Sequence, residues 1–200
     1  VWTCSEFSRA AFAPYARTFV LPHVVKRLKP SPQDIAWARE RLGMEGKRTG
    51  RDFYFYTIVD SVNPRKNLET LLAAFSAAFS GEKGVHLVVK QYREACDLSE
   101  FPGVVNLPEM LSDEQISALH AVCDVYASAH HAVALGSPLS EAMAFGNPVI
   151  ATGYSGTMEF MNDTNSFPIP FTLFSVPEPI CKALPQLFHH GMTWADLDTG

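Results

Sequence analysis

An alternation of strand-like and helix-like segments, between about residues 53 and 151, constrains the fold of this chain most strongly. Helical segments with apolar residues every three to four positions separate the strand-like runs. Strands that alternate with helices of ten or more residues form a parallel sheet covered on both faces, so we expect an α/β, Rossmann-like fold. Five runs are rich in β-branched or aromatic residues, as buried strands are: 53–59, 85–89, 104–107, 123–127 and 148–151.

The residues before this alternation follow a different pattern. Ser5 has the position of a helix N-cap, and an apolar-periodic segment follows it to Phe12. Closely spaced prolines then predict a linker over residues 17–33. A second helix begins at Ser31, with proline in its first turn, and stops at Gly43.

Charge and cysteine content limit the partners and the compartment. The chain has 16 Lys and Arg against 21 Asp and Glu, a net charge of −5, whereas a broad nucleic-acid or membrane surface needs a basic excess. Its four cysteines form no CxxC pair and no cluster with zinc spacing. Such scattered cysteines are typical of a reducing compartment. We therefore expect a cytoplasmic protein with no nucleic-acid partner.

Ligands of open parallel sheets bind beyond the carboxyl ends of the strands, where loops lead into helices. The helix N-termini there offer free N–H groups and the positive end of the helix dipole, which suit a phosphate. We therefore expect an anion site at this edge of the sheet. Four loops expected there are polar or glycine-rich: 60–67, 107–115, 128–140 and 152–159.

Two of these loops carry candidate anion-binding groups. Arg65 and Lys66 stand at a helix N-terminus, where the dipole disfavours cations and a bound anion would relieve that cost. The alternative is a solvated turn. Gly153 and Gly156 allow the close backbone approach of a phosphate or sugar nest, although such spacing also occurs in plain turns. Neither GxGxxG nor a Walker A motif is present, which argues against an NAD enzyme or a P-loop NTPase.

Glu141 is a carboxylate on a helix otherwise made of Ala, Met and Phe. A half-buried carboxylate needs hydrogen bonds, and the two hydroxyls of a ligand diol would supply them. The alternative is a surface glutamate on the polar edge of an amphipathic helix.

The segment 141–152, EAMAFGNPVIAT, resembles the signature of the retaining GT-B glycosyltransferases of the "glycosyl transferases group 1" family. Residues 65–67, after a strand, resemble that family's donor-phosphate segment, and further matches follow in order and spacing. The resemblance covers about residues 52–200. It implies a donor-binding domain over 52–200 that is truncated at its C-terminus, a linker and helix over 21–51, and the tail of a preceding acceptor-binding domain over 1–20.

The resemblance also implies roles for single residues. Glu141 would accept hydrogen bonds from the donor ribose, and Lys66 with Arg65 would neutralise the diphosphate; Glu141 and Lys66 are the candidate catalytic residues. The amides around residues 155–157 would hold phosphate and sugar, and Leu107 and its neighbours would flank the base. No metal or other cofactor is expected, since cations and helix dipoles stabilise the leaving diphosphate. The donor-binding set is Ser61, Arg65, Lys66, Leu107, Glu141, Ser155, Gly156 and Thr157.

The implied activity is transfer of a sugar from a nucleotide-diphosphate sugar to a hydroxyl acceptor, with retention. The acceptor would be a glycan or a lipid-linked glycan in polysaccharide biosynthesis, at the cytoplasmic face of the inner membrane. The partner would be an N-terminal acceptor-binding domain, without which we expect the fragment to be inactive.

One position departs from the family pattern. Relatives usually carry a glutamate eight positions before Glu141, and this chain has Val133 there. If that carboxylate only hydrogen-bonds the sugar, its loss costs about 1.5–3 kcal/mol. Val133 leaves open a non-catalytic nucleotide-sugar-binding domain, or a fragment that binds nothing without its other half. His130 and His131 lie close by, but no acidic partner flanks them in the sequence.

Overall fold

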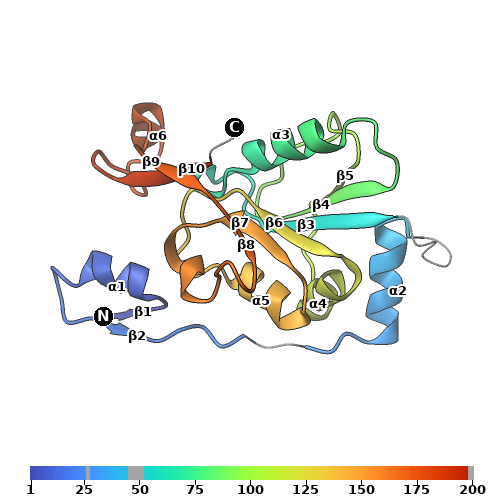
Figure 1. Cartoon of the computed structure of the whole chain (residues 1–200), viewed down its shortest axis with the longest axis horizontal. Helices are drawn as coiled ribbons and strands as arrows, with labels where there is room; N and C mark the ends of the chain where they lie inside the picture. Colours follow the sequence, from blue (N-terminus) through green and yellow to red (C-terminus); the bar gives the residue numbers. More distant parts are fainter. Residues whose placement is uncertain (26–27, 45–51, 198–200) are drawn as a thin grey trace.

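Six parallel strands form the central sheet of the computed structural model, which describes residues 1–25, 28–44 and 52–197 (Figure 1). Their spatial order is β5-β4-β3-β6-β7-β8. The α/β fold with a parallel sheet is therefore confirmed. The strands are β3 (Phe53–Val59), β4 (Val85–Gln91), β5 (Val104–Leu107), β6 (Val125–Ser128), β7 (Val149–Thr152) and β8 (Phe167–Ile169).

The strand order creates a switch point between β3 and β6. Counted along the chain, the six strands have the order 3-2-1-4-5-6 of a doubly wound Rossmann sheet. Strand β3 pairs with β4 on one side and with β6 on the other, where Phe55 faces Val125 and Tyr56 faces Tyr126. Crossovers leave this point in opposite directions, and ligands of open α/β sheets bind beyond the carboxyl ends of the strands at such a point.

Helices cover the sheet unequally (Figure 1). Helix α3 (Leu68–Phe79) packs on one face through Leu68, Leu72 and Phe75. The other face carries α2 (Pro32–Arg41), α4 (Asp113–Val122) and α5 (Ser137–Phe145). Capping boxes at Ser31 and Ser112 begin α2 and α4. In each box the serine hydroxyl accepts a hydrogen bond from the backbone N–H three positions on, and the side chain of that residue accepts one from the serine N–H.

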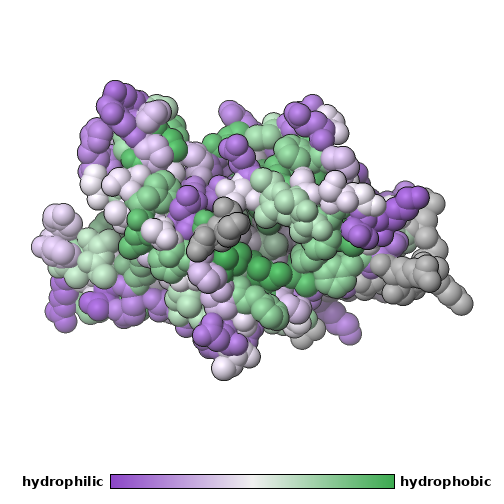
Figure 2. Space-filling model, turned by 45° about the horizontal axis from the view of Figure 1, so that its top comes forward, coloured by the Kyte–Doolittle hydropathy of each residue, from purple (hydrophilic) through white to green (hydrophobic). Residues whose placement is uncertain are grey.

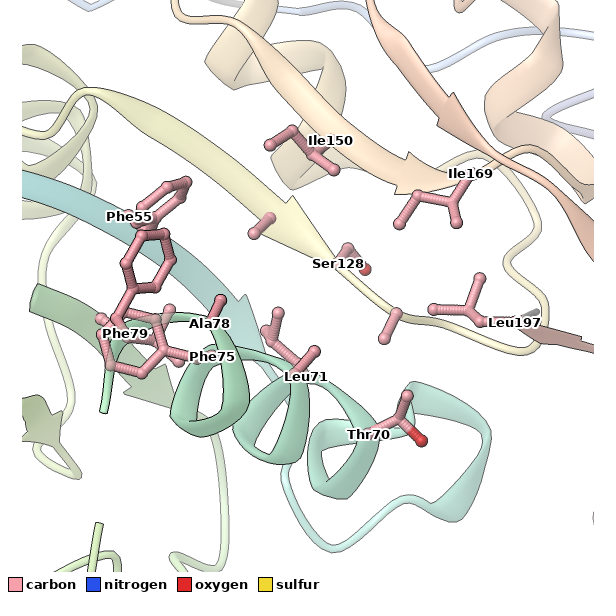
Figure 3. Close-up of a pocket in the computed structure, with 14 residues that line it drawn as sticks. Phe55, Thr70, Leu71, Phe75, Ala78, Phe79, Ser128, Ile150, Ile169 and Leu197 are labelled. Carbon is pink, nitrogen blue, oxygen red and sulfur yellow. The ribbon is translucent and has the colours of Figure 1, made fainter. Parts of the chain in front are cut away.

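An apolar cavity of about 250 Å³ lies between α3 and strands β6 to β8. Figure 3 shows Leu71, Ile150, Ile169 and Leu197 pointing into it, and its polar lining residues are Thr70 and Ser128. Hydrophobic residues also gather at the centre of the molecule in Figure 2, a view that turns α3 forward. Without a charged side chain in its lining, this cavity does not suit a phosphate.

The N-terminal segment forms a small unit of its own. Strands β1 (Trp2–Thr3) and β2 (Phe19–Val20) pair in parallel around α1 (Glu6–Phe12), which Ser5 caps as expected. The linker predicted over 17–33 is therefore wrong at its start, where β2 lies. The Glu159 carboxylate joins this unit to the sheet domain, since it accepts hydrogen bonds from the Glu6 and Phe7 amides at 2.8 and 3.3 Å.

The last described residues form an antiparallel pair that the sequence patterns did not predict. Strand β9 (Phe171–Ser175) pairs with β10 (Thr193–Leu197), and α6 (Glu178–Ala183) lies between them in the chain. A separate core holds this unit together, with Trp194 and Phe188 in edge-to-face contact. The short strand β8 was also missed. The run predicted to start at 123 begins at Val125, because Cys123 still bonds to Leu119 as the cap of α4.

Candidate functional site

The four polar loops expected at one edge of the sheet follow β3, β5, β6 and β7, so they do share its carboxyl edge. Hydrogen bonds join the loops on the two sides of the switch point. The His131 amide donates to the Arg65 carbonyl at 2.9 Å. The Asn67 side chain donates to Ala129 at 2.9 Å, and the Arg65 guanidinium donates to the Ala132 carbonyl. These bonds fix the two loops relative to each other at the switch point.

Two partly buried cations, Arg65 and Lys66, lie at the switch point in the 3₁₀ turn η1 (Pro64–Lys66), which precedes α3. Burial and the neighbouring charge of Arg65 lower the pKa of Lys66 to about 8, although Asp60 opposes the shift. Burial also lowers the pKa of Arg65. The Asp60 carboxylate acts on both cations but does not offset their burial, so a bound anion would add further stabilising charge.

The adjacent histidines have different partners. His130 is buried, and its Nδ1 lies 3.0 Å from the Ser128 hydroxyl. Burial lowers the pKa of His130 to about 4, and Lys66 adds to the shift, so the ring is neutral at pH 7. His131 donates from Nδ1 to the Ala195 carbonyl at 2.7 Å and stacks on Trp194. His131 therefore links β10 to the loop after β6 through a hydrogen bond and a ring contact.

The loop that carries Val133 packs directly on the glycine-containing turn η2 (Ser155–Glu159). The Val133 amide donates to the Ser155 hydroxyl at 2.9 Å, and the Gly156 amide donates to the Val133 carbonyl at 3.0 Å. A Cβ on Gly156 would lie 1.9 Å from the Ala134 carbonyl oxygen. The Gly156 N–H is thus already bonded within the protein, whereas the expectation for the other amides of this turn stays a prediction.

The other residues predicted in this turn are also enclosed by protein. Ser155 has a φ of 72° and is buried, with its hydroxyl held by Val133. Thr157 is buried too, and its hydroxyl donates to the Tyr154 carbonyl at 3.0 Å. Their side chains thus maintain the shape of the loop against which a ligand would lie.

Glu141 lies on α5 and faces α4 rather than the two cations. Its side chain is 36% exposed, which agrees with the expected half-buried carboxylate, and its Oε2 lies 3.6 Å from the His120 Nε2. Glu141 also lines a cavity of about 160 Å³ together with Asp113, Ser117 and His120. This cavity holds two carboxylates and a hydroxyl, which suit a ligand that carries hydroxyl groups.

The side chains of Leu107 and Ser61 both contact protein. Leu107 is 0% exposed and belongs to the core under α4, so a contact between this segment and a base would come from its backbone or its neighbours. The Ser61 hydroxyl donates to the Glu94 carbonyl at 3.2 Å. Sequence reasoning missed Asp113 and His120, although their spacing of seven along α4 places both on one helical face.

No three His, Cys, Asp or Glu residues in the described part of the chain come close enough together to hold a metal ion.

The family model "Glycosyl transferases group 1" matches residues 47–172. No curated protein matches the chain by sequence. Among solved structures, WaaG, described as a glycosyltransferase involved in lipopolysaccharide biosynthesis, is 20% identical with a TM-score of 0.61 over 82% of this chain and 47% of WaaG. Sucrose-phosphate synthase from Thermosynechococcus elongatus is 19% identical with a TM-score of 0.64 over 85% of this chain and 45% of the synthase.

A third structure is a single domain: the C-terminal domain of LpcC, a glycosyl transferase group 1 family protein from Francisella tularensis. It is 16% identical with a TM-score of 0.54, and the match covers 82% of this chain and 87% of that domain. The chain spans about half the length of WaaG and of the synthase. At these identities the structural matches show the fold alone.

Proposed function

The chain belongs to the glycosyl transferases group 1 family, and from that premise we propose that it is the donor-binding part of a retaining glycosyltransferase. The donor is a nucleotide-diphosphate sugar and the acceptor is a hydroxyl group. The observation that carries the proposal is the pair of half-buried cations, Arg65 and Lys66, at the switch point of a doubly wound sheet.

Such cations suit the chemistry of sugar transfer. The bond between the anomeric carbon and the diphosphate oxygen breaks, the bond to the acceptor oxygen forms, and the departing diphosphate takes up the proton of the acceptor hydroxyl. Negative charge grows on the departing diphosphate, where the Lys66 ammonium stabilises it in a partly dehydrated site. The Arg65 guanidinium adds positive charge but is held by the Ala132 carbonyl, so its direct contact with phosphate is smaller.

Glu141 binds the other end of the nucleotide in this proposal. Helix α5 begins at Ser137 beside the switch-point loops, and Glu141 lies one turn further on, roughly 6 Å along the helix axis. Its carboxylate accepts hydrogen bonds from the ribose hydroxyls, and Asp113 offers a second acceptor in the same cavity.

The remaining parts of the enzyme follow from the family. Residues 52–200 are the donor-binding domain, and residues 1–20 belong to the acceptor-binding domain whose main part lies in the N-terminal half. The fragment alone does not turn over, because the acceptor site is in that other half. The acceptor is a glycan or lipid-linked glycan at the cytoplasmic face of the inner membrane. Among the described helices, none has both the length and the hydropathy to cross a bilayer.

One observation favours a second candidate, a non-catalytic nucleotide-sugar-binding domain. Val133 stands where relatives usually carry a glutamate, and it is only 5% exposed, with its amide and carbonyl bonded to the η2 turn. Transfer assays on the full-length protein separate the two candidates. Turnover with Val133 in place would contradict the non-catalytic candidate.

We expect one nucleoside diphosphate among UDP, GDP, ADP and dTDP to raise the melting temperature of this chain. A ligand at 100 times its Kd adds about 2.7 kcal/mol of stability, which a melting curve resolves. Glu141→Ala should lose most of this shift, because two hydrogen bonds to a charged group, worth about 1.5–3 kcal/mol each, disappear. Glu69→Ala, at an exposed position of α3, is the control and should keep the shift. If none of the four nucleotides shifts the wild-type chain, the proposed donor site is wrong.

Nucleotide binding should also weaken above pH 8. The diphosphate prefers the charged form of Lys66, whose pKa in the free protein is about 8, so binding raises that pKa and takes up a proton. The Kd should therefore be constant well below pH 8 and rise towards tenfold per pH unit above it. Calorimetry in buffers of different ionisation enthalpy measures the proton uptake. Lys66→Arg keeps its charge and should flatten the profile; an unchanged profile in that variant would assign the titration to another group.

A further inference from the structure

His120 is a buried histidine outside the cluster of switch-point loops. It lies in the last turn of α4, is 1% exposed, and stacks on Phe145 of α5 with ring centroids 5.2 Å apart. Its Nδ1 lies 2.7 Å from the Tyr56 hydroxyl of β3. Its Nε2 has no hydrogen-bond partner among the described residues, and the Glu141 Oε2 lies 3.6 Å from it.

The neighbours of His120 determine where its proton is. The Asn147 side-chain amide donates to the His120 carbonyl at 2.7 Å and to the Tyr56 hydroxyl oxygen at 2.8 Å. A carbonyl can only accept, so the Asn147 group at this point is the NH₂ and not the oxygen. Among the described residues, the only acceptor within hydrogen-bond distance of the Tyr56 hydroxyl is the His120 Nδ1, so we assign the hydroxyl hydrogen to that contact. Burial raises the pKa of Tyr56 well above its usual range, so this hydrogen is retained.

The His120 Nδ1 is therefore an acceptor, and in the neutral ring the Nε2 carries the hydrogen. That N–H is directed at a carboxylate and is shielded from water. The distance of 3.6 Å exceeds that of a hydrogen bond, so the contact is a charge–dipole attraction that a small rotation of the Glu141 side chain would shorten.

We propose that His120 is a positioning residue for Glu141: its Nε2–H holds one carboxylate oxygen, so that the other faces the cavity and the donor hydroxyls. The chain of hydrogen bonds from Asn147 through Tyr56 fixes the tautomer that does this. This inference rests on the proposed function, in which Glu141 binds the donor. It deepens that function by naming the group that orients the Glu141 carboxylate between α5 and α4.

Two variants of similar size test the role of the Nε2–H. His120→Gln keeps an N–H donor near the position of the Nε2, whereas His120→Met has none. We expect His120→Met to weaken binding of the stabilising nucleoside diphosphate at least fivefold, and His120→Gln to stay within about twofold of the wild type. In a Glu141→Ala background, His120→Met should have no further effect, because the residue it positions is gone. Equal losses in the two backgrounds would mean that His120 only maintains packing, which would overturn the proposal.

A second measurement does not depend on nucleotide binding or on the folding of the His120 variants. ¹⁵N NMR of the histidine rings distinguishes a hydrogen on Nε2 from one on Nδ1. We expect the His120 signal of the wild-type chain to report Nε2–H, to move in Glu141→Ala, and to remain in place in the control Glu69→Ala. A hydrogen on Nδ1, or a signal insensitive to Glu141→Ala, would overturn the proposal. If the NMR result holds while no nucleotide binds, the proposed function fails and the His120–Glu141 contact stands.

Discussion

Replacing Gly156 with alanine should lower the free energy of unfolding by about 3 kcal/mol or more. The new Cβ would lie 1.9 Å from the Ala134 carbonyl oxygen and 2.8 Å from the Leu135 amide nitrogen. Both are backbone atoms, so no side chain can rotate out of the way, and the two loops must separate. Separation would also break the bond from the Gly156 amide to Val133. Urea denaturation of the wild type and the variant measures the effect.

Gly81→Ala is the matched control for this variant. Gly81 has a φ of +80°, and nothing lies within 4 Å of a Cβ built on it. Its substitution therefore introduces backbone strain without a clash, a cost of roughly 1–2 kcal/mol. If Gly156→Ala cost no more than Gly81→Ala, the loops would not be in the close contact described here.

The strands flanking the switch point could be predicted because their local signals agree with their tertiary environment. Residues 53–59 are aromatic and β-branched throughout, as suits a strand paired on both sides. Ser112 and Gln115 form a capping box that fixes the start of α4 whatever packs on it. The structure of such elements depends mainly on residues that are close in the sequence, so a single sequence is enough to predict them.

The C-terminal elements lack such local signals. Strand β8 has only three residues and contains Pro168, which a strand tolerates at the edge of a sheet, where β8 lies. Strands β9 and β10 are stabilised by each other and by Trp194, whose ring stacks on His131 from the switch-point loop. Contacts of this kind join distant parts of the chain, and no periodicity in the sequence predicts them.

The candidate site also has a part that could be predicted from the sequence and a part that could not. The position of Lys66 beside a helix N-terminus follows from the sequence, because a strand precedes it and a helix follows. The direction of the Glu141 side chain does not, since it depends on how α5 packs against α4 and on His120. The burial of the Leu107 side chain could not be read from the resemblance either, because it depends on how α4 packs on the sheet.

Val133→Glu should be the most informative change at the departure from the family pattern. The methyl groups of Val133 pack near Gly136, and Thr157 and Leu139 reach the same spot. A carboxylate there would be buried without a donor, so we expect the unfolding free energy at pH 7 to fall by about 3 kcal/mol. Burial would raise the pKa of the new carboxyl group, so the cost should be full above that raised pKa and shrink as the pH falls through it. Urea denaturation between pH 5 and pH 8 measures this dependence.

Val133→Gln has the same shape without the charge and should show a smaller, pH-independent loss. Comparing the two variants shows whether a charged side chain at position 133 stays buried or turns toward a donor sugar. The Val133 amide and carbonyl are both bonded to the η2 turn, which directs the side chain inward. A carboxylate at position 133 could turn toward a donor sugar only if these two hydrogen bonds to the η2 turn broke. A Val133→Glu chain as stable as the wild type at pH 7 would mean that the loop turns outward at little cost, and the inward direction inferred here would be wrong.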